Sequence, residues 1–268
     1  MVGNHAVPMV AEAYTKGFKG FDAGKVFAII KHSQTVSHPL KSNWEVYMKY
    51  GYFPYDLIDS ESVSSTLENV YNDYAVSDMA KRLGKTKETE YFAKRAEFYK
   101  NLFENGINFM RPRLSDGSWT VPFDPMRAGE NTGYTEGNVW QYTWHVQHDV
   151  PGLIELFDGP EEFAAKINSM LLLELKTDIV DISDLIGQNA HGNEACHHVA
   201  YLYALAGQPK KTQELICRIF DTQYSPRPDG LCGNDDCGQM STWYMFFTMG
   251  FYPADPSAAS MYSEPPAS

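Results

Sequence analysis

Carboxylates in two polar loops are the residues of this sequence best suited to acid–base chemistry. In the first loop, Glu136 follows Tyr134 and precedes a helical pattern that contains Trp140. A carboxyl group packed against phenol and indole rings is desolvated, which raises its pKa and suits it to general-acid catalysis. A glutamate in the first turn of a helix can also serve only to interact with the helix dipole.

The second loop, GNDDCG, contains Asp235 and Asp236 and is followed by Gln239. A loop carboxylate with neighbouring amides can orient a water molecule and accept its proton. One of the two aspartates could instead cap the helix that begins nearby. One protonated and one ionised carboxylate, held in separate loops, are the pair that inverting glycoside hydrolysis requires.

A third polar segment, HGNEACHH (191–198), contains candidate metal ligands. The spacing of its histidines and glutamate does not match HExxH, which disfavours a transition-metal site. The side-chain oxygens of Asn193 and Glu194 suit a hard cation such as calcium better. Asn193 could equally be a helix cap. Other polar residues have ordinary explanations as caps, turns or surface pairs: Asn4, His5, Tyr52, Asp56, Glu68, Asp73, Arg111 and Asp124.

The elements that must position these loops are predicted to be helices. Apolar residues recur at three and four positions over 62–83, a GKT turn follows, and a second helix begins at Thr86, so we expect an αα-hairpin. Ser65 and Glu68 fit a capping box for the first helix. One strand is predicted, at 118–125. Further helices are expected near 7–17, 23–33, 137–147, 160–173, 194–206, 210–222 and 237–249.

Paired helices over this length predict an all-α fold, an (α/α)6 barrel of helical hairpins with short β segments in loops. The inventory of about nine helices is smaller than six hairpins require, so the barrel is expected to be incomplete. We assign residues 1–253 to this partial catalytic domain. The Pro-, Ser- and Ala-rich residues 254–268 are predicted to be a disordered tail.

Composition excludes several classes of function. The chain has 268 residues and a net charge of −12, which argues against nucleic-acid binding and suits a neutral ligand, a cation or simple solubility. No apolar run is long enough to span a membrane, and the N-terminus lacks the pattern of a signal peptide. The four cysteines have no zinc-site spacing; Cys232 and Cys237 could form a disulfide or stay free, and the disulfide status of Cys196 and Cys217 stays open.

Seven stretches from Met1 to about Pro253 recur in the order of one known family. They are MVGNHA, ESVSSTLENVYND, FMRPRLSDGSW, PFDP, YTEGNVWQYTW, HGNEACHH with HVAYLYALAGQPKKTQ, and PDGLCGNDDCGQMSTWY followed by GFYP. The sequence resembles glycoside hydrolase family 92, the bacterial exo-acting α-mannosidases. The resemblance implies hydrolysis of terminal α-linked mannose with inversion. It also implies a calcium ion that binds sugar hydroxyls, and an active site between the barrel and a preceding β-sandwich domain.

The resemblance also assigns roles to individual residues. Glu136 matches the general acid, and Asp236 matches the general base with Asp235 beside it. Some relatives have an acidic residue where Asn234 stands. Some α-1,2-specific relatives have a glutamate where Gly192 stands, so we predict no linkage. We expect His191, Glu194, Trp140 and Asn234 to contact substrate, and Asn193 and Gln239 to bind calcium.

The sequence lacks the β-sandwich and the first barrel helices of the family, so we expect a fragment with impaired activity. The parent enzyme is expected in the periplasm or outside the cell. Two other functions stay open. One is a non-catalytic remnant that binds mannose in the presence of calcium. The other is a different α/α-toroid enzyme, such as a sugar lyase or epimerase, which would need neither calcium nor a paired acid and base.

Overall fold

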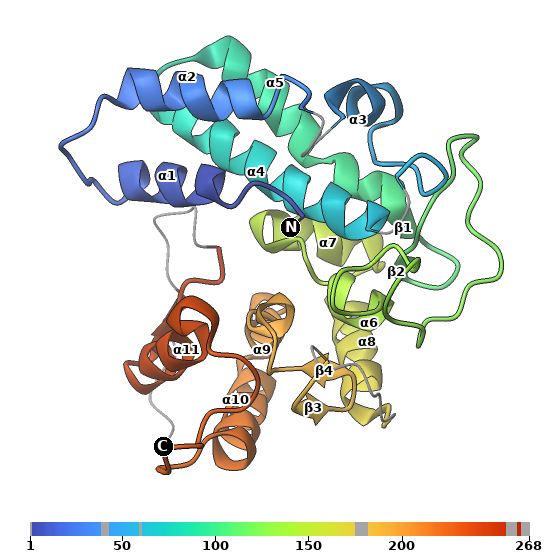
Figure 1. The fold of residues 1–268 in the computed structure, drawn as a ribbon. Coiled ribbons are helices and arrows are strands. Elements are labelled where there is room, and N and C mark those ends of the chain that lie inside the picture. Colours follow the sequence, from blue (N-terminus) through green and yellow to red (C-terminus); the bar gives the residue numbers. More distant parts are fainter. Residues whose placement is uncertain (1, 39–42, 59–60, 175–181, 256–261, 264–268) are drawn as a thin grey trace. The chain divides into compact units, whose positions relative to one another are not determined.

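The computed structural model describes residues 2–38, 43–58, 61–174, 182–255 and 262–263. The chain divides into two compact units, where the sequence predicted one domain over 1–253. Unit 1 comprises Met1–Asp124, Glu130–Thr135 and Asp255–Ser260; unit 2 comprises Pro125–Gly129, Glu136–Ala254 and Met261–Ser268. Both contain mainly helices and only two-residue strands, as the all-α prediction requires (Figure 1).

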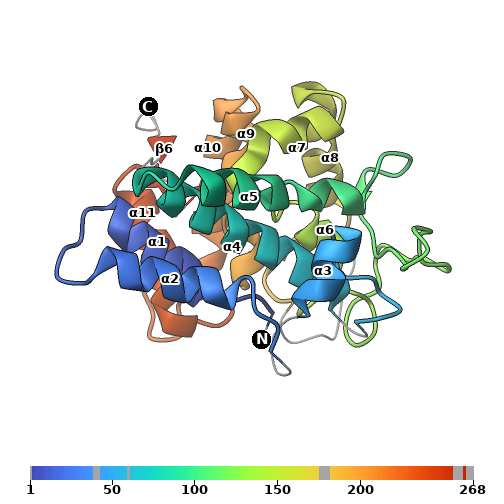
Figure 2. The same ribbon diagram turned by 90° about the horizontal axis from the view of Figure 1, so that it is seen from above.

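Four helices of unit 1 pack around one apolar core (Figures 1 and 2). They are α1 (Ala6–Thr15), α2 (Ala23–Ser33), α4 (Ser62–Arg82) and α5 (Thr86–Ala96). Val7, Phe27, Met79 and Phe92 bury their side chains in this core. The predicted hairpin is α4 with α5, and the left-handed backbone of Gly84 lies in the turn between them. The unit also contains α3 (Trp44–Tyr50), η1 (Phe98–Leu102), β1 (Phe103–Glu104) and β2 (Phe109–Met110).

A buried ion pair joins α4 to α5. Arg95 Nε donates to Asp73 Oδ2 at 2.9 Å, and Nη2 lies 2.9 Å from Oδ1, while Tyr47 also donates to the carboxylate. Arg95 Nη1 donates to the carbonyl of Gln34. Asp73 is therefore not the cap, turn or surface residue that the sequence suggested. Burial raises its pKa to about 7, against the opposing attraction of the guanidinium.

Unit 2 carries the loops singled out in the sequence. Its helices are α6 (Val139–Tyr142), η2 (Gln147–Asp149), α7 (Val150–Leu156), α8 (Pro160–Leu172), η3 (Glu194–Cys196), α9 (Val199–Leu205), α10 (Pro209–Gln223), η4 (Asp236–Gly238) and α11 (Gln239–Thr248). Its strand pairs are β3 (Leu185–Ile186) with β4 (Asn189–Ala190), and β5 (Phe251–Tyr252) with β6 (Tyr262–Ser263). Trp144, Phe157 and Phe163 form an aromatic core with ring centroids 5.4–5.5 Å apart.

Several local predictions differ from the structure. No strand forms over 118–125, where Trp119 makes only an isolated bridge to Arg113, because Pro122 and Pro125 have no N–H to donate to a ladder. The helix predicted over 137–147 is limited to α6. The capping box is wrong, since α4 begins at Ser62 and Ser65 lies inside it. Strand β6 lies in the segment predicted to be a tail; 256–261 and 264–268 are outside the described residues.

Candidate functional site

Glu136 lies at the entrance to α6 with an unusual backbone conformation. Asn138 caps the helix, accepting from Trp140 N at 2.8 Å, and Gln141 Oε1 accepts from Asn138 N at 2.7 Å, so the turn is fixed. The φ angle of Glu136 is 51°. Its side chain is exposed, so the expectation that aromatic rings bury this carboxyl is wrong.

Two residues have positive φ angles that their residue types do not favour. Among the described residues, six that are not glycine have positive φ angles, and four of them are Asn or Asp, which tolerate this conformation. The other two are Glu136 and Cys237, the residue after Asp236. A left-handed non-glycine residue is strained by about 1–3 kcal/mol, and such strain gathers at functional sites. Both strained positions therefore lie in the loops that the sequence selected for catalysis.

The HGNE segment reaches the Glu136 carboxylate directly. Asn193 Nδ2 donates to Glu136 Oε2 at 3.3 Å, so the predicted metal ligand orients the predicted acid. Asn193 makes no side-chain cap bond to η3, which disfavours the capping alternative. The next residue, Glu194, accepts a hydrogen bond from Gln239 Nε2 at 3.0 Å through its Oε2. The same Gln239 nitrogen donates to the carbonyl of Asn234 at 3.1 Å, which links HGNE to GNDDCG.

A backbone contact brings these two loops together. A Cβ atom on Gly233 would lie 2.1 Å from the carbonyl oxygen of Gly192, and a Cβ on Gly192 would lie 3.1 Å from Gly233 Cα. Gly233 also has a φ of 59°. Only glycine permits this approach, because side chains at either position would push the backbones apart. The sequence offered no signal for this pairing beyond the glycines themselves.

Gly233→Ala is expected to lower the free energy of unfolding by about 3 kcal/mol, from the positive φ together with the backbone clash. Urea denaturation measures the loss. Gly207→Ala is the matched control, since Gly207 has a φ of 78° but nothing within 4 Å of the added Cβ, and it should lose only about 1 kcal/mol. Equal losses in the two variants would show that the contact between the loops is not formed.

Asp235 caps α11. Its Oδ1 accepts from Met240 N at 2.9 Å and Ser241 N at 3.0 Å, and its Oδ2 accepts from Ser241 Oγ at 2.8 Å. These bonds, first those from Ser241, lower the pKa of Asp235. The sequence left open which of the two aspartates caps the helix, and in the structure it is Asp235. Asp236 is exposed at the start of η4, directly beside this anchor.

Asp235→Ala is expected to lower the free energy of unfolding at pH 7 by about 1 kcal/mol, the usual effect of losing a helix cap. Because folding lowers the pKa of this carboxyl, its contribution is present above its unfolded value of about 3.9 and is lost as the pH falls below it. The difference between variant and wild type should therefore shrink as the pH is lowered below that value. Asp229→Ala, at an exposed loop aspartate, is the control; a difference that persists in acid would contradict the capping role.

Two predicted substrate contacts are buried. His191 is 1% exposed, and its Nε2 lies 3.0 Å from the hydroxyl of Tyr224. Burial lowers the pKa of His191 to about 3, with His197 as a second cause, so the ring is neutral. Trp140 is 9% exposed, and Lys166 Nζ lies 4.8 Å from its ring centroid. Among the other predicted site residues, Glu136, Glu194, Asn234, Asp235 and Asp236 are exposed.

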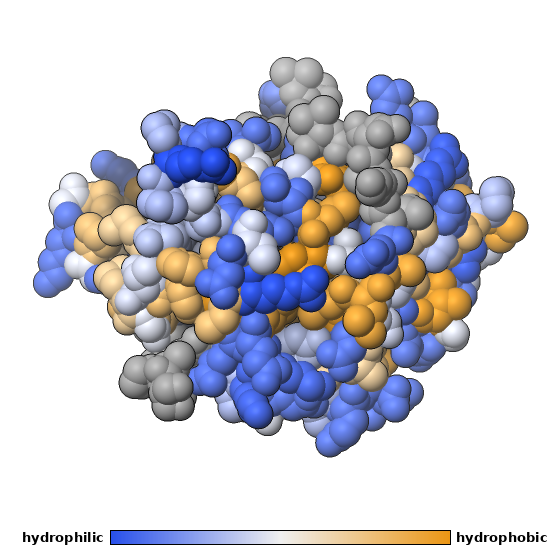
Figure 3. All heavy atoms as spheres, turned by 90° about the horizontal axis from the view of Figure 1, so that it is seen from below, coloured by the Kyte–Doolittle hydropathy of each residue, from blue (hydrophilic) through white to orange (hydrophobic). Residues whose placement is uncertain are grey.

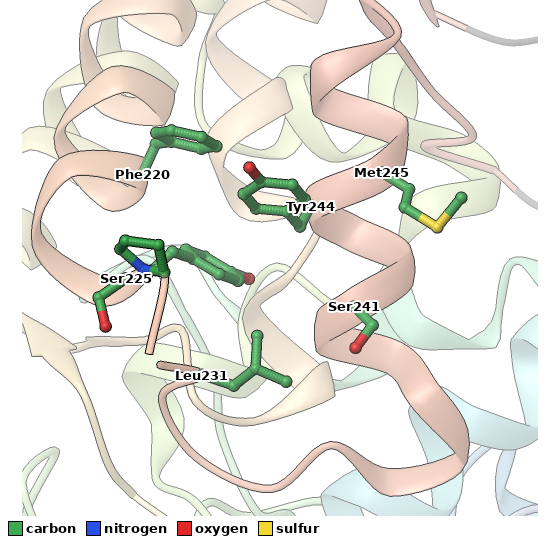
Figure 4. Close-up of a pocket in the computed structure, with 8 residues that line it drawn as sticks. Phe220, Ser225, Leu231, Ser241, Tyr244 and Met245 are labelled. Carbon is green, nitrogen blue, oxygen red and sulfur yellow. The ribbon is translucent and has the colours of Figure 1, made fainter. Parts of the chain in front are cut away.

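A pocket of about 340 Å³ lies between α10 and α11 (Figure 4). Its lining residues have no charged side chains: Phe220, Tyr224, Ser225, Pro226, Leu231, Ser241, Tyr244 and Met245. Ser241 connects the pocket wall to Asp235, and Tyr224 connects it to His191. Figure 3 shows apolar residues exposed among hydrophilic ones on one face of the molecule.

Within the described part of the chain, no group of three or more His, Cys, Asp or Glu side chains could hold a metal ion. His197 Nε2 lies 3.1 Å from the carbonyl oxygen of His191, and His198 Nε2 lies 2.8 Å from that of Trp144. All four cysteines are free, so Cys232 and Cys237 form no disulfide.

Comparison with known proteins identifies the family. The profile of the glycosyl hydrolase family 92 catalytic domain matches residues 1–267. The chain belongs to glycosyl hydrolase family 92. The resemblance predicted from the sequence motifs is thereby confirmed.

Solved structures of family 92 members share the fold. An α-mannosidase from Bacteroides thetaiotaomicron, in complex with mannoimidazole, matches with a TM-score of 0.94 and 41% identity over 100% of this chain and 36% of its own. An inverting mannosidase from Bacteroides thetaiotaomicron VPI-5482 matches with a TM-score of 0.87 and 33% identity over 99% and 38%. These matches confirm the predicted all-α, partial (α/α)6 catalytic fold, and this chain spans little more than a third of either relative.

A curated fungal relative matches at the sequence level. An uncharacterized secreted glycosidase of Arthroderma benhamiae is 26% identical over 289 residues, which cover 94% of this family 92 chain and 35% of the relative. No helix within the described ranges of the chain is long and apolar enough to cross a membrane.

Proposed function

We propose that unit 2 carries the acid–base site of an exo-α-mannosidase that hydrolyses terminal α-linked mannose with inversion. The observation that carries this proposal is the position of the Glu136 carboxylate. Glu136 precedes α6 and has a left-handed backbone, and its Oε2 accepts a hydrogen bond from Asn193 Nδ2 at 3.3 Å. Family 92 relatives of similar fold are described as α-mannosidases, and one as inverting. The activity of the whole protein is part of the proposal, because this chain spans only about a third of those relatives.

In this mechanism Glu136 is the general acid. It donates its proton to the glycosidic oxygen as the bond to the anomeric carbon breaks, and Asn193 Nδ2 keeps the carboxyl oriented. Asp236 is the general base and accepts a proton from the water that attacks the opposite face of the sugar. The products are mannose and the free hydroxyl of the remaining glycan. Asp235 holds the loop that carries Asp236 by capping α11.

Calcium is the cofactor that the family implies, and the oxygen donors fit it. Gln239 Oε1 is buried without a hydrogen-bond partner among the described residues, and the Glu194 carboxylate lies beside the same amide. Calcium favours carboxylate and amide oxygens of this kind. Glu194 and Gln239, with Asn193, would hold the ion, and Asn234 and Glu194 would meet sugar hydroxyls. When bound, calcium would polarise those hydroxyls and ease flattening of the ring.

Calcium is expected to raise the melting temperature of the wild-type chain, and Gln239→Leu should abolish the increase by removing the buried oxygen. Differential scanning calorimetry with calcium, with magnesium and with a chelator measures the effect. At 100 times the dissociation constant, calcium would add about 2.7 kcal/mol of stability. Gln208→Leu, at the N-cap of α10, is the control; an equal calcium response in Gln239→Leu would contradict this ligand set.

Mannose release from an aryl α-mannoside tests the proposed reaction. Asp236→Asn is expected to lower kcat by about 10²–10⁴-fold, because the attacking water loses its base. The melting temperature should stay unchanged, since the side chain is exposed and the Asp235 cap is intact. Release that is unaffected by Asp236→Asn would contradict the assignment of the base.

A calcium-dependent mannose-binding remnant is the second candidate. The exposure of both Glu136 and Asp236 favours it, because proton transfer is most effective in a site from which water is excluded. Binding of mannoimidazole without mannose release would support this second function.

In the whole protein, we propose that a β-sandwich domain encloses the site. We also propose that the enzyme acts outside the cytoplasm, since the fungal relative is named a secreted glycosidase.

A further inference from the structure

Tyr224 follows the last residue of α10, and it holds the first residue of the HGNE segment. Its hydroxyl lies 3.0 Å from His191 Nε2. Its ring is nearly parallel to that of Trp243, with centroids 5.7 Å apart, and the His191 ring meets the same indole edge-on at 4.4 Å. His191 is therefore fixed both by a hydrogen bond and by an aromatic contact.

The position of His191 determines that of Asn193. Only Gly192 separates them, and its backbone is pressed against Gly233. The backbone N–H of His191 donates to the carbonyl of Asn189, and that of Asn193 donates to the carbonyl of Ala190, so the two residues belong to one hydrogen-bonded turn. Asn193 Nδ2 then donates to Glu136 Oε2. A continuous path of bonded and packed groups thus runs from the Tyr224 hydroxyl to the carboxyl of the proposed acid.

We propose that Tyr224 is a positioning residue for Glu136, acting through His191 and Asn193. This inference rests on the proposed function, in which Glu136 protonates the leaving group. Tyr224 itself would touch neither the sugar nor the reacting atoms. Without its hydroxyl, the buried Nε2 of His191 loses this partner, the ring can turn, and the amide of Asn193 moves away from the carboxyl.

The Tyr224 hydroxyl and the His191 imidazole are both uncharged. Burial raises the pKa of Tyr224, and burial lowers the pKa of His191 to about 3. The hydrogen bond between the hydroxyl and the imidazole therefore joins two uncharged groups.

Leaving-group dependence distinguishes loss of acid positioning from general damage. Tyr224→Phe keeps the ring and removes the hydroxyl. With mannobiose, whose leaving group needs a proton, kcat should fall by about 10–100-fold, since small displacements of a catalytic group have effects of this size. With 2,4-dinitrophenyl α-mannoside, whose leaving group needs none, kcat should change by less than about 3-fold. An equal loss with both substrates, or no loss with mannobiose, would overturn the proposal.

Tyr244→Phe is the matched control, because Tyr244 lines the same pocket and stacks on Phe220 with centroids 5.0 Å apart. The side-chain amide signals of Asn193 in ¹H–¹⁵N NMR spectra provide a readout that does not need turnover. They should shift in Tyr224→Phe and not in Tyr244→Phe. If the wild-type chain released no mannose, the proposed function would fail for this chain, whereas unchanged Asn193 signals in Tyr224→Phe would overturn the positioning role.

Discussion

Arg95→Ala is expected to lower the free energy of unfolding at pH 8 by about 3–5 kcal/mol, the largest stability effect that the structure predicts. The substitution leaves the Asp73 carboxylate buried without its counter-ion, and Tyr47 alone cannot compensate for that charge. It also removes the guanidinium from the rings of Trp44 and Tyr91, whose centroids lie 5.0 and 5.4 Å away. Chemical denaturation of both proteins measures the loss.

The loss in Arg95→Ala should be smaller at pH 5 than at pH 8. Folding raises the pKa of Asp73 to about 7, above its unfolded value of about 3.9. Because the guanidinium opposes this rise, the pKa of Asp73 is higher still in Arg95→Ala, and keeping the carboxyl buried as the pH rises from 5 to 8 costs the variant more stability than the wild type. Lys210→Ala, which removes an exposed pair with Glu214, is the control and should have little effect. A loss that grows toward acid would contradict this account.

Glu136→Gln is expected to lower kcat for a mannoside with a poor leaving group by about 10²–10⁴-fold. The amide has nearly the same shape and can still pair with Asn193, so the fold and the melting temperature should be unchanged. The only function that it lacks is a proton to donate at the glycosidic oxygen.

The kcat of Glu136→Gln on an activated aryl mannoside is compared with its kcat on mannobiose. The leaving group of the aryl mannoside departs without protonation, so the variant should retain most of its kcat. Glu155→Gln, at an exposed glutamate of α7 in the same unit, is the control and should match the wild type with both substrates. Equal rates for Glu136→Gln and wild type on mannobiose would exclude Glu136 as the acid.

The hairpin of α4 and α5 was predicted from apolar residues that recur at three and four positions and from the glycine that a left-handed turn requires. The predictions failed where tertiary contacts decide the outcome. α6 ends after one turn although 137–147 has a helical pattern, and α7 was missed beside it. Periodicity describes one face of an element, and it contains no information about what packs on that face.

The sequence indicated the residue types of the candidate site but not their arrangement. The loops around Glu136 and Asp236 were selected because polar residues with special backbone geometry, held between helices, are where binding and chemistry usually occur. The sequence did not decide which of Asp235 and Asp236 caps α11, since either could have reached the N-terminus of that helix. Nor could the sequence show that Tyr224, 33 positions from His191, would hold it. Such pairings follow from the packing of α10 on α9, which local sequence does not encode.

The first-formed mannose anomer tests the central claim most directly. Mannobiose is incubated with the wild-type chain and calcium, and the anomeric protons are followed by ¹H NMR before mutarotation equilibrates them. The account predicts that β-mannose appears first, that a chelator stops its release, and that Glu136→Gln produces almost none. Initial release of α-mannose, or β-mannose formed equally fast by Glu136→Gln, would contradict it.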